Sequence, residues 1–254
     1  MDKLTKSFFR SNSDYRYYVL LKIIESSEAP LGSWILKEKV ENHGIDISIA
    51  TIGRLLKYLD GKGYTELIPN QGRKISSKGK MYLHSVEVDL NRYLVEKQFI
   101  EASKPRSQKD LIDLLHARMV IEVETARLAS INATKEDIKK IEGSFNNHCK
   151  HVKEEQDPTE VGCHFHEVVA EASHNYFLYS TLRFLIHEEI EMEKKFPYLA
   201  TRSLGGHYVQ EHEDILKAIK NKNPEAAVFY MGNHMKNLIK TIEESFIGGE
   251  KRFQ

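Results

Sequence analysis

The chain has 254 residues, 37 Lys plus Arg against 37 Asp plus Glu, and a hydrophobic content of 41%. That content suffices for one large or two ordinary globular domains and excludes a disordered chain. No stretch approaches 18 uninterrupted apolar residues. Charged residues interrupt the first 18 residues, so they contain no apolar run that could serve as the hydrophobic region of a signal peptide. We therefore expect a cytoplasmic protein without a membrane span or secretory leader. Cys149 and Cys163 lack CxxC spacing, which argues against a disulfide framework or a zinc knuckle.

The charge is unevenly distributed along the chain. Residues 1–85 contain 14 Lys/Arg and 9 Asp/Glu, a net charge of +5, so the remainder carries −5. Glycine is frequent before residue 80 and rare over residues 80–160, which predicts short elements with turns followed by long helices. A basic segment joined to an acidic one suggests a nucleic-acid-binding domain attached to a different domain, although chance variation of a few charges remains an alternative.

Residues 1–83 are predicted to form a winged-helix DNA-binding domain, with three helices and a β-hairpin. The segment YRYYVLLKIIES has helical apolar spacing, and a second helix is expected over 33–42, ending at Gly44. Ser48 is a suitable N-cap for a third helix, which ends near Gly61. Trp34 is expected in the core of this domain.

The third helix has the features of a DNA-recognition helix. Thr51, Arg54 and Lys57 lie opposite its apolar stripe, so its first turns suit the major groove and its later cations suit phosphate. Arg73 and Lys74 follow the turn of the predicted hairpin, as in a wing lying along the DNA backbone. Each feature has an ordinary alternative: Arg54 as a solvated helix charge, and the Arg73-Lys74 pair as a charged strand edge. Residues 18–83 resemble the winged-helix domains of archaeal and bacterial transcription regulators, which favours DNA binding.

The rest of the chain is predicted to be all α, so the fold class is mainly α. Residues 84–106 are expected to form a linker helix and linker, and residues 107–250 a helical bundle. No segment there alternates with the period of a strand. Thr134 with Asp137 has the spacing of a capping box, and Asn175 is interpreted as a helix cap rather than a ligand.

Three histidines stand on different predicted helices of this bundle, each beside apolar residues. His166, His212 and His234 would bind a divalent metal if their imidazoles converged. The alternative is that each is a buried histidine bonded to a neighbouring helix, which is the commoner case.

Three stretches of the bundle resemble the FadR-type (FCD) ligand-binding domain of GntR-superfamily regulators. They are LLHARMVIEVETARLAS, FHEVVAEASHNYFL and EHEDILKAIKNKNPEAAVFYMGNHM. The resemblance implies that His166, His212 and His234 hold a divalent transition metal, zinc or nickel. The Asp usual in that family four residues before the first histidine is Gly162 here. Water, an effector, Cys163 or His164 would then have to replace it.

Arg118 lies four residues before Glu122, so the two side chains share a helix face and can form a pair. The family resemblance instead implies that Arg118 faces the pocket and binds the carboxylate of an effector, for which a guanidinium is well suited. The two interpretations remain open at this point.

Together these features predict a ligand-responsive transcription regulator that binds double-stranded DNA as a homodimer and senses a small carboxylate. The usual N-terminal winged helix of the superfamily has a different signature, so the DNA-binding domain is expected to be atypical. One alternative is a metal-dependent enzyme with His164 as an additional ligand and Glu167 as general base, although no HExxH motif is present. Another is a helical adaptor that does not bind DNA.

Overall fold

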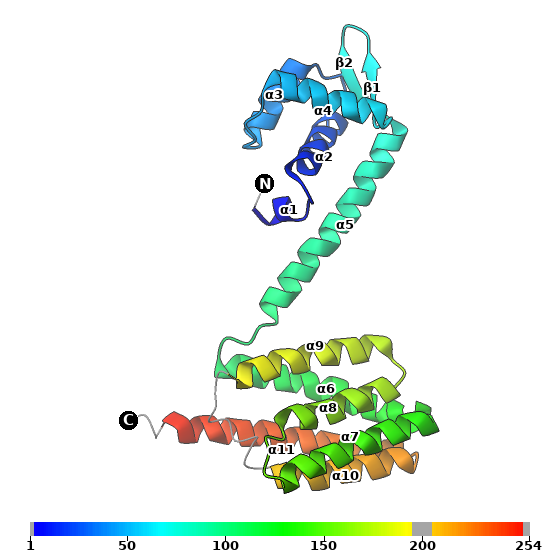
Figure 1. The fold of residues 1–254 in the computed structure, drawn as a ribbon, viewed down its shortest axis with the longest axis vertical. Helices are drawn as coiled ribbons and strands as arrows, with labels where there is room; N and C mark the ends of the chain where they lie inside the picture. The colour runs from blue at the N-terminus through cyan, green and yellow to red at the C-terminus, as the bar shows by residue number, and fades with distance from the viewer. Residues whose placement is uncertain (1–2, 195–204, 251–254) are drawn as a thin grey trace. The chain divides into compact units, whose positions relative to one another are not determined.

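The computed structural model describes residues 3–194 and 205–250. The chain divides into two compact units, Met1–Ala102 and Ser103–Gln254, which are described separately. The N-terminal unit (Figure 1) contains α1 Lys3–Ser7, α2 Asn12–Glu25, α3 Ser33–Asn42, α4 Ile49–Gly61, β1 Thr65–Ile68, β2 Gly72–Ile75 and α5 Ser77–Ala102.

The core of the N-terminal unit lies between α2, α3 and α4, where Leu21, Leu36 and Ile52 are fully buried. Ser48 caps α4 as predicted, because its hydroxyl accepts a hydrogen bond from the Thr51 backbone N–H at 3.2 Å. The prediction for Trp34 was wrong: 75% of this residue is exposed. Successive residues of a helix are 100° apart, so Trp34 lies about 200° around α3 from Leu36 and faces solvent.

The predicted hairpin is present as an antiparallel pair in which Thr65 faces Ile75 and Ile68 faces Gly72. Gly72 adopts a φ of 120°, and a Cβ there would lie 2.3 Å from the backbone of Leu31. Only glycine therefore allows Leu31 to form its bridge with Arg73 beside the hairpin.

The expected linker helix is longer than predicted. It is α5, which begins at Ser77 rather than at residue 84, and Leu83 and Leu90 on it are buried in the core of the N-terminal unit. The non-helical connection is consequently short and spans residues 103–107. Burial of Leu83 and Leu90 attaches α5 to the compact N-terminal unit, which extends to Ala102.

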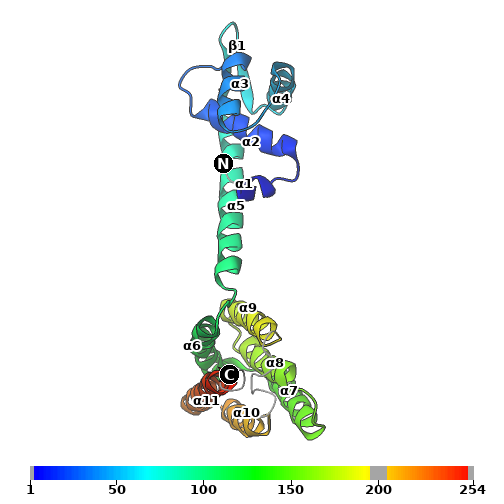
Figure 2. The same ribbon diagram turned by 90° about the vertical axis from the view of Figure 1, so that its left-hand side faces the viewer.

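The C-terminal unit is all α in the part that the structure describes. Its helices are α6 Gln108–Asn132, α7 Lys135–Lys153, α8 Thr159–Ala172, α9 Tyr176–Glu193, α10 Gly205–Lys220 and α11 Pro224–Glu250. They pack in the cyclic order α6, α11, α10, α7, α8, α9, and α6 also contacts α8 and α10 (Figure 2). The capping box of Thr134 and Asp137 is present, and Asn175 caps α9 through the backbone N–H of Leu178.

This packing encloses a core made by Leu115, Phe165, Ile215, Met231 and their neighbours. The helices in the described residues are all too short or too polar to cross a membrane. Because the six helices pack around one core, polar side chains on their inner faces lie close to one another.

Candidate functional site

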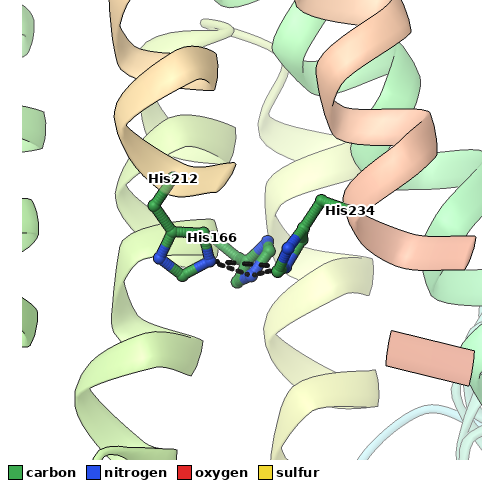
Figure 3. A group of neighbouring side chains, drawn as sticks. All are labelled: His166, His212 and His234. Carbon is green, nitrogen blue, oxygen red and sulfur yellow. Dashed lines mark hydrogen bonds between the residues drawn. The ribbon is translucent and has the colours of Figure 1, made fainter. Parts of the chain in front are cut away.

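Three histidines meet inside the C-terminal bundle, from α8, α10 and α11. The Nε2 atoms of His166, His212 and His234 are separated by 3.2, 3.2 and 3.3 Å. Each residue is no more than 3% exposed. Figure 3 shows the three rings with these nitrogens facing one another. The structure thus brings together the three histidines that the sequence singled out.

Hydrogen bonding among the rings does not account for this triangle. Nδ1 of His234 lies 2.6 Å from a carboxylate oxygen of Glu211, and Nδ1 of His166 lies against Glu122. An ionised carboxylate only accepts, so each Nδ1 donates and leaves Nε2 with a lone pair. The contact between Nε2 of His166 and Nε2 of His234 then joins two acceptors. A bound cation would relieve that repulsion.

The donor set fits a divalent metal. Imidazole nitrogens bind zinc at about 2.0–2.1 Å, which places them about 3.3 Å apart in a tetrahedral site. Carboxylates behind the Nδ1 atoms are a common support for metal-binding histidines. Within the described residues, His166, His212 and His234 are also the group of His, Cys, Asp and Glu side chains whose ligand atoms converge.

His212 is held differently from the other two. Its Nδ1 lies 3.0 Å from Nδ1 of His148 on α7, and its ring stacks on Phe165 with centroids 4.3 Å apart. His148 is 2% exposed. His148 was not predictable as a site residue, because its spacing in the sequence resembles no ligand motif.

The surroundings of His212, His166 and His148 favour the neutral form of these three histidines. Burial, reinforced by neighbouring histidines, lowers the pKa of His212 well below its ordinary value. Burial also lowers the pKa of His166, against the opposing effect of Glu122, and lowers the pKa of His148 to about 4. Because a metal binds only the deprotonated imidazole nitrogen, these shifts favour metal binding near neutral pH.

Arg118 on α6 lies beside the histidines and is fully enclosed. Its Nε and Nη2 donate to Glu122 at 2.8 and 2.7 Å, and its Nη1 donates to Glu189 on α9. Burial would raise the pKa of Glu122, but Arg118 and His166 outweigh it and hold this pKa at about 2. Burial raises the pKa of Glu189 despite the same arginine. The pair predicted between Arg118 and Glu122 is thus present, together with a second carboxylate that the sequence did not indicate.

A pocket of about 440 Å³, its open mouth included, joins these groups. It is bordered by Arg118, Glu189, the three converging histidines, His148 and Gly162. Of the two side chains considered as substitutes for the missing Asp, Cys163 borders the pocket but its sulfur is outside the converging ligand atoms. The side chain of His164 is 57% exposed and faces Glu167 at 3.6 Å, so it lies outside the site.

The five residues predicted to contact DNA all lie in the N-terminal unit. Arg54 and Lys57 are exposed on α4, and Lys74 is exposed on β2. Arg54 Nη2 donates to the Thr51 hydroxyl at 3.1 Å, which holds the guanidinium over the first turn of α4.

Arg73 differs from the other four. Its Nε and Nη2 donate to Asp60 at 3.0 and 2.9 Å, and its side chain is 18% exposed. This guanidinium is already engaged in joining the hairpin to α4. Its role as a phosphate contact stays a prediction, and in this structure Arg73 supports the hairpin.

The sequence matches two domain families. Residues 113–237 match the FCD domain, and residues 18–83 match the Ribonuclease R winged-helix domain. Over 130 residues the chain is 29% identical to the Uxu operon regulator of Haemophilus influenzae. The C-terminal unit of this chain therefore contains an FCD domain. The match spans 50% of this chain and 48% of that relative, about half of each.

The winged-helix match covers the same residues as the resemblance drawn from the sequence, so the prediction of a winged helix is confirmed. Solved structures with a similar fold include Streptococcus agalactiae GntR, at 20% identity and a TM-score of 0.47, covering 90% of this chain and 97% of that one. E. coli McbR/YncC is 13% identical with a TM-score of 0.49, covering 97% and 100%.

Proposed function

We propose that this protein is a ligand-responsive transcription regulator. In this proposal its N-terminal unit binds double-stranded DNA, and its C-terminal unit binds a small carboxylate beside a divalent transition metal, zinc or nickel. The observation that carries the metal assignment is the triangle of Nε2 atoms. The buried lone pairs of His166 and His234 face each other at 3.2 Å, with Nε2 of His212 beside both, and a bound cation would replace their repulsion by attraction.

DNA binding is supported by the exposed face of α4 and by the hairpin that follows it. Thr51 and Arg54 are held together by a hydrogen bond, which favours one presentation of the guanidinium to base edges. Lys57 and Lys74 are exposed, and their ammonium groups can contact phosphates of the DNA backbone. One winged helix contacts few base pairs, so we propose a homodimer that binds two half-sites.

The carboxylate is proposed from the surroundings of Arg118. This arginine borders the same pocket as the three histidines, so one small anion can contact a metal and the guanidinium together. Glu189 already accepts from Nη1 of Arg118, and burial disfavours its charged form. We therefore propose that the effector carboxylate displaces Glu189, while Glu122 continues to hold the other edge of the guanidinium.

Metal analysis of the purified full-length protein tests the central element of this proposal. The wild-type protein should carry about one equivalent of zinc or nickel per chain, and His166→Ala, His212→Ala and His234→Ala should each lose it. His151→Ala is the matched control, because this histidine lies on α7 and its Nδ1 contacts only the Asn147 carbonyl at 2.9 Å. Equal metal content in the wild-type and the three site variants would contradict the proposal.

The FCD match and the similarity to the Uxu operon regulator favour regulation over the metal-dependent enzyme considered from the sequence. The exposed position of His164 also removes one of that enzyme's four proposed ligands from the site. Salt-dependent binding of duplex DNA by the full chain would distinguish a regulator from an adaptor that does not bind DNA.

A further inference from the structure

His148 and Gly162 occupy facing positions on α7 and α8. A Cβ added at Gly162 would lie 3.8 Å from Nε2 of His148 and 3.9 Å from its Cε1. Both residues border the pocket that contains the three converging histidines. The imidazole of His148 therefore lies next to the space that a side chain at position 162 would otherwise fill.

The proton of His148 can be placed from the contacts of its neighbour. If Nε2 of His212 binds the metal, its Nδ1 carries the proton and donates to Nδ1 of His148 at 3.0 Å. A neutral His148 that accepts at Nδ1 carries its own proton on Nε2. The N–H that results lies at the pocket, next to the space beside Gly162.

We propose that His148 donates a hydrogen bond, through Nε2, to a carboxylate oxygen bound at the metal in the space left open by Gly162. This inference rests on the proposed metal site. It adds a specificity-determining residue: an oxygen ligand that accepts a hydrogen bond is favoured, and a ligand without an acceptor leaves the buried N–H unsatisfied. Glycine at 162 is part of the arrangement, since an acidic side chain there would bring its own acceptor into this space.

The test uses the full-length protein loaded with Co²⁺, whose visible absorption reports the ligands around the ion, and acetate as the probe. Acetate should change the spectrum of the wild-type protein in a saturable way. His148→Asn separates the two contacts of His148, because an amide oxygen can replace Nδ1 as the acceptor for His212 while nothing replaces Nε2. With Co²⁺ held saturating, acetate should bind the variant about ten-fold more weakly or worse.

Two further variants complete the experiment. Gly162→Asp should retain Co²⁺ and no longer respond to acetate, because its own carboxylate occupies the position. His151→Ala, on the same helix and outside the pocket, should match the wild-type protein in both measurements.

The outcomes separate this inference from the metal proposal. A wild-type protein that gives no Co²⁺ spectrum would overturn both. Normal Co²⁺ binding with unchanged acetate affinity in His148→Asn would overturn only the role of His148. A change in the Co²⁺ spectrum of His148→Asn before acetate is added would make His148 a direct ligand and would also overturn the inference.

Discussion

The cores of the two units differ in their content of polar groups. Thr65 and Ser76 are the buried polar side chains among the described residues of the N-terminal unit. The described part of the C-terminal unit buries an arginine, two glutamates and four histidines together. Stability and proposed function are therefore separable in the first unit, where the DNA-contacting candidates are on the surface. They are coupled in the second, where the proposed binding groups are themselves core residues.

Replacing Arg118 should give the largest effect and expose this coupling. Arg118→Ala leaves the carboxylates of Glu122 and Glu189 buried without their cation, so we expect a loss of about 3–5 kcal/mol in the free energy of unfolding of the C-terminal unit. Urea unfolding measures it. Arg127→Ala is the control, because this arginine lies on the same helix and pairs with Glu124 at the surface. Similar losses in both variants would argue against a special role for the buried pair.

Adding metal should stabilise the C-terminal unit and leave the stability of the N-terminal unit unchanged. Zn²⁺ at about 100 times its dissociation constant should stabilise the C-terminal unit by about 2.7 kcal/mol, because only the folded site binds the ion. Calorimetry should show a higher unfolding temperature for that unit and an unchanged unfolding temperature for the N-terminal unit. The same shift in His212→Ala would mean that the ion binds somewhere else.

In the N-terminal unit, Arg54→Ala should weaken binding to a preferred duplex by about 1–3 kcal/mol without changing stability. Fluorescence anisotropy with a selected site measures the affinity, and thermal melting measures the stability. Arg92→Ala, an exposed arginine on α5, is the control. Unchanged affinity for the preferred duplex in Arg54→Ala would remove α4 from the proposed interface.

The smallest effect is expected from Lys74→Ala. A lysine that meets a phosphate contributes to all sequences alike, so the variant should weaken every duplex equally and reduce the salt slope by about 1. Binding measured from low to moderate salt gives this slope. A loss confined to one duplex sequence would instead indicate that Lys74 contacts bases.

Most of the helices and both strands were predictable because their signals are local. Ser48, Thr134 and Asn175 act as caps as expected, and the apolar stripe of α4 faces the core. Trp34 was placed in the core because of its residue type, whereas its position on α3 makes it face solvent.

Local sequence patterns were enough to predict the two kinds of unit, the positions of most elements, and a possible metal group made by His166, His212 and His234. The side chains that surround these histidines could be identified only once the packing of the helices was known. His148 and Glu189 come from helices far along the chain, and they reach the site because α7 and α9 each turn one face toward the interior. Spacing within a helix determines which residues share a face, whereas packing between helices determines which faces meet. The proton on Nε2 of His148 is therefore inferred only from contacts between α7, α8 and α10.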